Sequence, residues 1–510
     1  MRGFWIGVAA GCAFLVIELV GRVVAGAPTI PELIQDRLVL FLPGPVFSFV
    51  LDRLLYLGKP ALFASLLLLQ LVLAGLGGLV FRRWREPVAL AVVPWLVTGL
   101  ILLPIAGQGI FAGSVAETVV SLLAFAAYAV ALVVYSTEEQ NAPRLVAAGR
   151  SAPEMAAGPA APATSRRLIV GGGLSFLASL VLGRGVIGNL PSLPPVPDAP
   201  ATGSGAVAST VAPTAVAAVP SMVTPPDSFY VVSKNLIDPV VDAASWHLQV
   251  TGLVSHPIDL KYNDILALPA QQTYQTLECI SNEVGGDLIS NGLWTGTRLA
   301  DILHTAGVAS DATAIHFTSV DGYTDSMAVA KALDPSTLLA YKLDGQPLPS
   351  KHGFPLRVLG TGTYGMKNPK WLTKIEVVKE ALPGFWEQQG WDSAAIVQTM
   401  ARIDAPQSGV SLHLAPLVVE GIAFAGSRGI QRVDVSTDGG KSWNAAELKQ
   451  PLGPNTWVFW QYAWQPGAAG GYTVVARAID GTGHVQTASQ AETYPSGATG
   501  YDSIDLRVDA

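Results

Sequence analysis

Long apolar runs occupy much of the first 190 residues of this 510-residue chain, and none of similar length follows. Five runs come close to the roughly 20 residues that a helix needs to cross a bilayer. They lie at residues 4–24, 60–81, 88–105, 115–135 and 168–190. The apolar stretch 38–57 is interrupted by prolines and charges, so we expect a re-entrant or interfacial helix there.

From residue 229 the pattern changes to short strands and helices separated by Gly, Pro and Asp turns. Such a mixture predicts an α+β domain of ordinary size. The expected strands are 246–252, 315–319, 357–360 and 371–378, and the expected helices are 300–306 and 329–333.

After residue 402 the helical signal fades and apolar residues alternate with polar ones, which is typical of strands. Asp-Gly pairs at 438–439 and 480–481 supply turns between them. The pattern predicts a β-sandwich of about 100 residues. Its expected strands are 417–423, 430–436, 455–464 and 472–479.

Two segments have too few large apolar residues to build a core. Together with the runs above they divide the chain into seven parts. These are a transmembrane region (1–135, about four spans), a cytoplasmic linker (136–167), a fifth span (168–190), a tether rich in Pro and Ala (191–228), a catalytic domain (229–385), a connector (386–401) and a β-domain (402–510).

Basic residues near the ends of the runs predict the orientation, because they favour the cytoplasmic side. One side would hold Arg2, Arg82, Arg83, Arg85, Arg144, Arg150, Arg166 and Arg167, and the other Arg22, Arg37, Arg53 and Lys59. The prediction is a multi-pass protein of the cell membrane with its N-terminus inside and everything after residue 190 on the extracytoplasmic side. If residues 38–57 cross the membrane instead, the predicted orientation changes.

The pair Arg166-Arg167, directly before the fifth run, resembles an internal twin-arginine export signal. Two arginines that simply obey the positive-inside rule explain it as well. Glu18, inside the first run, allows two interpretations in the same way: a proton or ion path, or a partner for a neighbouring helix.

Composition and charge exclude some functions. The net charge is −7, so the chain offers no basic stripe for a nucleic acid. The first histidine is His247, which excludes a haem held by paired histidines within the spans.

Cys279 stands out because the only other cysteine, Cys12, lies in the first apolar run. A lone cysteine in an exported domain can be a small buried hydrophobe, a nucleophile or a ligand for a soft metal. No hydrolase motif accompanies it, so nucleophilic catalysis with a histidine base ranks last of the three.

The neighbourhood of Cys279 and several later motifs resemble the sulfite oxidase family of molybdopterin enzymes, in the family's order. The matching pieces are residues 276–282, 294–296, 321–326, 339–341, 352–357 and 364–371. The region after them resembles the family's immunoglobulin-like dimerisation domain through residues 385–387, 426–430 and 435–443. The resemblance implies a molybdenum-molybdopterin cofactor and a homodimer.

The resemblance also assigns roles to the matching residues. Cys279 becomes the thiolate ligand of the metal and Tyr323 a catalytic phenol that assists proton movement, although a turn tyrosine packed over Gly322 is the alternative. Asn282 orients the cysteine loop. The implied contacts to the pterin and its phosphate are His352, Arg357, Lys367 and Lys370. Lys367 also fits a solvated surface charge, and His352 a turn cap.

One departure bears on the substrate. Sulfite-oxidising members of the family typically have an arginine directly after the Cys-x-x-Asn run, whereas this chain has Glu283. An acidic residue opposes a dianionic substrate. We therefore expect two-electron oxygen-atom transfer on a small substrate, with sulfur oxyanions, sulfoxides and N-oxides all open. The chain has no His-Pro-Gly-Gly haem motif, so a separate electron-transfer partner is expected.

A different class of function is a cofactor-free adhesion or sensor protein whose outer domains only bind. The coexistence of Cys279 with Arg357 and Lys370 argues against it.

Overall fold

The structure is a computed structural model that divides into two compact units, and each is described by itself. The first unit holds the N-terminal helices, and the second holds residues 239–510 together with residues 221–232. The described residues are 2–25, 27, 29–34, 58–105, 110–112, 115–148, 221–235 and 238–510.

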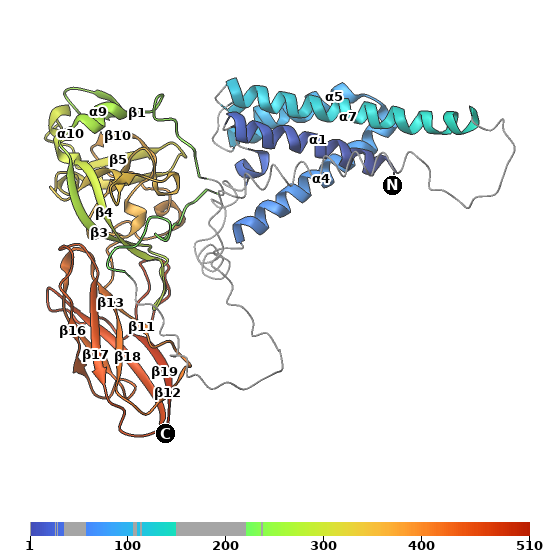
Figure 1. Cartoon of the computed structure of the whole chain (residues 1–510). Helices are drawn as coiled ribbons and strands as arrows, with labels where there is room; N and C mark the ends of the chain where they lie inside the picture. Colours follow the sequence, from blue (N-terminus) through green and yellow to red (C-terminus); the bar gives the residue numbers. More distant parts are fainter. Residues whose placement is uncertain are drawn as a thin grey trace. The chain divides into compact units, whose positions relative to one another are not determined.

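The first unit contains three helices that are long and apolar enough to cross a membrane. They are α1 (Arg2–Ala25), α4 (Gly58–Trp84) and α7 (Val115–Ala148), drawn in Figure 1. The three correspond to the first, second and fourth predicted spans. The fifth predicted span, the twin-arginine pair and the 38–57 segment lie outside the described residues.

The third predicted span, 88–105, differs from the expectation. Its apolar helix is shorter, Pro87–Leu102, and comprises α5 (Pro87–Val97) followed by a π-helical turn, Thr98–Leu102. Pro94 lies inside α5 and has no N–H for the helical ladder, which is a common cause of such irregular turns.

Glycines allow α1 and α4 to pack backbone to backbone. A Cβ added to Gly7 or to Gly78 would collide with the main chain of the other helix. Close approach through small residues is a usual way for apolar helices to associate. Glu18 of α1 accepts a hydrogen bond of 2.8 Å from Gln70 of α4. Of the two interpretations of Glu18, an ion path or a partner on a neighbouring helix, the structure shows the partner.

Two sheets and three short helices form the first domain of the second unit (Figure 1). One sheet has the order β2 (Ile258–Lys261), β1 (His247–Gly252), β10 (Leu372–Val378), β5 (Ala314–Ser319) and β6 (Thr324–Ala328). The other has the order β3 (Gln271–Glu278), β4 (Ile289–Arg298), β7 (Leu338–Leu343) and β8 (Gln346–Pro347), with β9 (Arg357–Leu359) paired to β7. The helices are α9 (Tyr262–Ala267), α10 (Leu299–Ala306) and α11 (Val329–Ala332). The strands and helices expected in this region are confirmed, with ends that differ by a residue or so.

The second sheet is buried on both faces. Alternate residues of β7 enter different cores: Leu339 and Tyr341 pack with α10, whereas Leu338 and Ala340 pack with Trp294. Successive side chains of a strand point to opposite faces, so a strand between two cores needs apolar residues throughout. This sheet carries the segments around Cys279 and Arg357.

The C-terminal domain is rich in strands, as the alternation predicts. A four-stranded sheet has the order β11 (Met400–Ala405), β13 (Leu417–Phe424), β17 (Val458–Trp464) and β16 (Glu447–Leu448). A five-stranded sheet has the order β12 (Ser411–His413), β19 (Asp502–Asp509), β18 (Gly470–Asp480), β14 (Ile430–Ser436) and β15 (Asn444–Ala445). Both sheets contribute to one core, which includes Val419, Trp460, Val433, Ala476 and Leu506.

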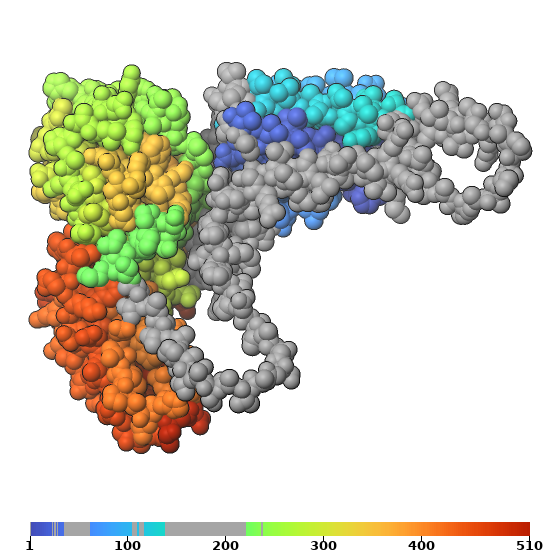
Figure 2. Space-filling model, viewed as in Figure 1, coloured from blue at the N-terminus to red at the C-terminus, as the bar shows by residue number. Residues whose placement is uncertain are grey.

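The two domains of the second unit are joined by hydrogen bonds close to the cysteine loop. The backbone N–H of Trp457 donates to the Thr276 hydroxyl at 2.9 Å, and the Arg402 guanidinium donates to the Gly286 carbonyl at 2.7 Å. The Met222 carbonyl accepts from Asn291 of one domain and Trp457 of the other. In Figure 2 the segment 221–235, in green, runs along this junction.

The close pairing of β11 and β13 yields a stability prediction. A Cβ at Gly421 would collide with the Arg402 carbonyl oxygen, so Gly421→Ala has to displace β11. We expect it to lower the free energy of unfolding by about 1–3 kcal/mol, measured by urea denaturation of the full chain in detergent. Gly467→Ala is the control, because a Cβ there meets nothing within 4 Å. Equal stability of the two variants would contradict the packing described.

Candidate functional site

Cys279 lies in the loop between β3 and β4, and the loop is closed by its own hydrogen bonds. The Cys279 N–H donates to Leu288 O at 2.9 Å, and the buried thiol lies 3.0 Å from the Ser281 hydroxyl. Asn282 bridges the loop, because its Nδ2 donates to Glu278 Oε1 and its Oδ1 accepts from the Leu288 N–H. This geometry is what we expect if Asn282 orients the cysteine.

The charge of Cys279 reaches three buried tyrosines. Burial raises the pKa of Tyr230, Tyr323 and Tyr364 well above the ordinary value, and the charge of Cys279 adds to the effect in all three. The phenols therefore remain protonated. Neutral phenols near the thiol add no charge to its surroundings.

Glu278, directly before the cysteine, is a buried acid. Burial raises the pKa of Glu278 to about 7, although the Asn282 hydrogen bond and the charge of Arg402 oppose the shift. Its Oε2 is buried and has no hydrogen-bond partner. The carboxyl thus changes its charge near neutral pH.

Tyr323 lies between β5 and β6, and its hydroxyl donates to the Met366 carbonyl at 2.7 Å. Its ring faces Phe385 at a centroid distance of 6.0 Å.

Three of the predicted cofactor contacts lie together. Arg357 Nη1 donates to the His352 carbonyl at 3.1 Å, and the charges of Arg357, Lys370 and Lys351 all lower the pKa of His352. We call Lys351, His352, Arg357 and Lys370 the basic cluster. Lys370 also lies over the Trp371 ring at 4.3 Å.

Arg357 is buried and is held by neutral groups. Its guanidinium donates to the carbonyls of His352 and Asn368 and lies over the Trp294 ring at 5.2 Å. Its Nε has no hydrogen-bond partner, and among the described residues no carboxylate forms an ion pair with it. Burial lowers the pKa of Arg357 to about 10, so the group remains a cation at neutral pH.

His352 is neutral. Burial lowers the pKa of His352 to about 3, and the charges of the basic cluster contribute to the shift. Its Nε2 lies 2.9 Å from the Pro226 carbonyl, which can only accept, so Nε2 carries the proton and Nδ1 is an acceptor. The His352 side chain thus bonds a carbonyl of the turn at residues 226–228, as the turn-cap alternative expects.

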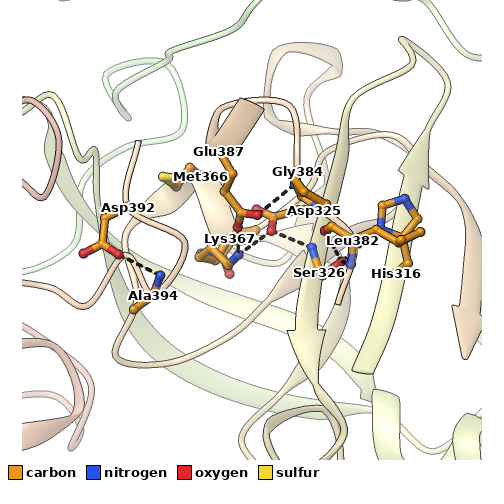
Figure 3. A network of polar contacts seen from close by, with 12 residues as sticks. His316, Asp325, Ser326, Met366, Lys367, Leu382, Gly384, Glu387, Asp392 and Ala394 are labelled. Carbon is orange, nitrogen blue, oxygen red and sulfur yellow. Dashed lines mark hydrogen bonds and ion pairs between the residues drawn. The ribbon is translucent and has the colours of Figure 1, made fainter. Parts of the chain in front are cut away.

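Lys367 is placed differently from the other predicted contacts (Figure 3). Its ammonium forms ion pairs with Asp325 and with Glu387, the latter at 2.6 Å; Lys367 and Asp325 are buried and Glu387 is partly buried. We call these three residues the ion-pair cluster. The alternative that Lys367 is a solvated surface charge is wrong, because two distant carboxylates enclose it.

The loop after Asn282 carries the acidic departure. Glu283 and Val284 are exposed, and Gly286 is held by Arg402 of the C-terminal domain. Arg402 itself pairs with Asp404 at 2.7 Å. Glu283 is thus the exposed charge closest in sequence to the cysteine.

The residues present fit a molybdopterin by the chemistry of their donors. A buried thiol offers the soft ligand, and the buried Arg357 has both an uncompensated charge and an unused N–H donor. A phosphate supplies the negative charge and the acceptor oxygens that such a group lacks.

Sequence reasoning found the cysteine loop and three members of the basic cluster, but it did not assign Lys351, Glu278, Tyr230, Tyr364 or the ion-pair partners of Lys367. A signal existed for Glu278, Tyr364, Asp325 and Glu387, which lie inside the motif segments. Tyr230 lies outside every motif, and the partners of Lys367 are 42 and 20 residues away in the chain.

Comparisons with known proteins agree with this geometry. A family model for an oxidoreductase molybdopterin binding domain matches residues 235–386. A second, for a Mo-co oxidoreductase dimerisation domain, matches residues 393–494.

Sulfite oxidases are among the relatives. Mitochondrial sulfite oxidase of Rattus norvegicus is 31% identical over 309 residues, which cover 51% of this chain and 57% of that protein. Sulfite oxidase of Arabidopsis thaliana is 32% identical over 329 residues, which cover 53% of this chain and 84% of that protein. The uncharacterised oxidoreductase YuiH of Bacillus subtilis is 36% identical over 164 residues, covering 32% of this chain and 81% of that protein.

Among solved structures, the sulfane dehydrogenase SoxCD from Paracoccus pantotrophus superposes with a TM-score of 0.51 at 20% identity. The match covers 62% of this chain and 96% of that chain. It supports a shared fold.

His352 gives a pH prediction. The pKa of about 3 in the folded chain is below the ordinary value of 6.5, so the unfolded chain binds one more proton between these limits. The contribution of His352 to stability is complete above pH 6.5 and is lost as the pH falls towards 3. Between pH 7 and pH 5 we expect wild type to lose about 2 kcal/mol more than His352→Asn, measured by urea denaturation. His304→Asn, on the exposed face of α10, is the control and should behave as wild type does.

Arg357 gives a prediction on cofactor retention. Arg357→Met removes the buried cation but keeps an unbranched side chain. We expect the affinity for the cofactor to fall about 10- to 100-fold, the range for hydrogen bonds to charged groups. The measurement is molybdenum per chain after purification and dialysis. Lys374→Met, which removes a half-exposed lysine paired with Glu376, should retain the metal. Full retention by Arg357→Met would contradict the assignment.

Proposed function

Because this chain belongs to the sulfite oxidase family of molybdopterin-dependent oxidoreductases, we propose that it is a membrane-tethered enzyme that transfers one oxygen atom to or from a small substrate. The observation that carries the proposal is the position of the buried Cys279 thiol, in a loop bridged by Asn282 and 3.0 Å from the Ser281 hydroxyl. The C-terminal domain is proposed to be the immunoglobulin-like dimerisation domain, which makes the protein a homodimer.

The residues of the site divide the work of holding the cofactor. Cys279 is the proposed metal ligand, and Arg357 and Lys370 provide positive charge for the phosphate. His352 is neutral and its Nδ1 can accept a hydrogen bond, which suits an N–H of the pterin. Lys367, which the resemblance made a further contact, is instead paired with Asp325 and Glu387. When bound, the molybdenum cofactor supplies a centre that exchanges an oxo group in a two-electron change.

Tyr323 is the proposed catalytic phenol. Its raised pKa keeps the proton on the oxygen, and its bond to the Met366 carbonyl fixes the direction of the hydroxyl. A phenol fixed in this way can orient a substrate by a hydrogen bond. Its proton moves only along such a bond. Glu278, whose pKa is about 7, is the nearest carboxyl in the sequence that changes its charge in the physiological range.

The acidic loop bears on the substrate. Glu283 is exposed and occupies the place where the sulfite-oxidising members typically have an arginine. Negative charge disfavours a dianion. Sulfoxides and N-oxides, which are neutral, therefore stand beside sulfur oxyanions as candidate substrates, and the direction of the reaction remains open.

The membrane part supports a tethered arrangement. Three helices of the first unit have the length and composition of membrane spans. With the predicted orientation, the catalytic and β-domains lie on the extracytoplasmic side and exchange electrons with a separate partner. A cofactor-free adhesion or sensor protein is not favoured, because both outer domains match models of molybdenum enzymes.

A serine substitution tests the function. Cys279→Ser removes the soft thiolate. Loss of a residue that only hydrogen-bonds a metal ligand costs up to about 100-fold in activity, so we expect loss of the ligand itself to lower turnover by more than about 100-fold. Turnover of the full chain in detergent is measured with artificial electron donors and acceptors against sulfite, dimethyl sulfoxide and trimethylamine N-oxide. Cys12→Ser is the matched control, because Cys12 lies in α1.

The same preparations are analysed for molybdenum. Near-stoichiometric metal in wild type supports the proposal, and its absence after expression in a host that makes the cofactor would support the binding protein instead. Undiminished turnover by Cys279→Ser would overturn the assignment of the ligand.

A further inference from the structure

The ion-pair cluster joins three separate segments of the chain (Figure 3). Asp325 belongs to β6, Lys367 ends the turn Gly365–Lys367, and Glu387 begins the turn Glu387–Gln389. Asp325 also accepts from the Ser326 N–H, and Glu387 Oε2 accepts from the Gly384 N–H at 2.8 Å. Each carboxylate is thus fixed to its own segment as well as to the lysine.

Tyr323 contacts two of these segments. Its hydroxyl donates to the carbonyl of Met366, the residue before Lys367. Its ring faces Phe385, and the Phe385 N–H donates to the Thr324 carbonyl at 2.8 Å. Asp325, which pairs with Lys367, is two residues from Tyr323. The ion pairs therefore hold in place both neighbours of the tyrosine ring and hydroxyl.

The charge of Lys367 is already balanced within the protein. Burial alone would lower the pKa of Lys367, but the two carboxylates outweigh it and raise the pKa. Burial raises the pKa of Asp325 to about 7 against the charge of Lys367, and the nearby Glu387 carboxylate adds to the rise. Arg357 differs, because among the described residues it has no such partner. A phosphate gains little from a cation that two carboxylates neutralise.

We propose that Lys367 is a positioning residue, which through Asp325 and Glu387 fixes the phenol of Tyr323 for the reaction proposed above, on which this inference rests. The ammonium joins the start of β6 to the turn that carries the Met366 carbonyl and to the segment that carries Phe385. Breaking the ion pairs lets these segments separate, and the phenol loses its fixed direction. Lys367 acts through Tyr323 and not through the cofactor.

A double-mutant cycle tests the proposal in the full chain loaded with cofactor. Its variants are Lys367→Met, Tyr323→Phe and both together. A displacement on the order of 1 Å at a reacting group costs about 100-fold in rate, so we expect Lys367→Met to lower kcat by about 10- to 100-fold. If Lys367 acts only through the phenol, its substitution in the Tyr323→Phe background changes kcat by less than about twofold.

Further readouts separate positioning from general damage. Lys367→Met should keep the molybdenum content of wild type, unlike Arg357→Met, and should change kcat more than KM. Lys367→Arg keeps the charge and should restore most of kcat. Lys374→Met, a lysine of β10 paired with Glu376 at 2.8 Å, is the control and should leave kcat unchanged. Should Lys367→Met not accumulate, Asp325→Asn is used in the same cycle.

The outcomes distinguish this inference from the function on which it rests. The inference is overturned, while the function stands, if the two substitutions lower kcat by factors that multiply in the double variant. Loss of molybdenum from Lys367→Met overturns it in the same way. A wild-type chain with neither molybdenum nor turnover overturns the function and the inference together. The inference is supported if the factors in kcat do not multiply in the double variant and Lys367→Met retains its molybdenum.

Discussion

Taking a positive charge out of water is costly, and this constraint accounts for the arrangement of the site. The protein buries two cations close to the same motifs and treats them in opposite ways. Lys367 receives two carboxylates, whereas Arg357 receives only carbonyl oxygens and an aromatic face. The first charge is used to join parts of the protein. The second remains available to an anion from outside the chain.

The fold supports this difference because the strands around the site are covered on both sides. β7 has a core on each face, and β9, which carries Arg357, pairs with it. Solvent is excluded from Arg357 by the same packing that stabilises the sheet. The C-terminal domain adds to the enclosure, because Arg402 reaches the carbonyl of Gly286 in the cysteine loop.

Much of the second unit could be predicted from the sequence, because its signals are local. Alternation identified β13, β14, β17 and β18, and the order of short motifs identified the cysteine loop and Arg357. β19 was missed although Ile504, Leu506 and Val508 alternate, since a long irregular stretch precedes it. The 88–105 segment has the composition of a span, but Pro94 and a π-helical turn interrupt it. The environment of Lys367 could not be predicted, because only the folded chain brings its two distant carboxylates together.

The hydrogen bond from Tyr323 to Met366 affects which molecules the phenol can bind. A phenol has a single proton, and Tyr323 gives it to the main-chain carbonyl of Met366. The oxygen that remains can therefore only accept at rest. If Tyr323 contacts the substrate as proposed, a molecule with its own hydroxyl or amine hydrogen can donate to the phenolic oxygen, whereas an aprotic oxygen has to compete with the Met366 carbonyl for the phenolic hydrogen. The Met366 carbonyl thereby disfavours ligands that can only accept a hydrogen bond from this phenol.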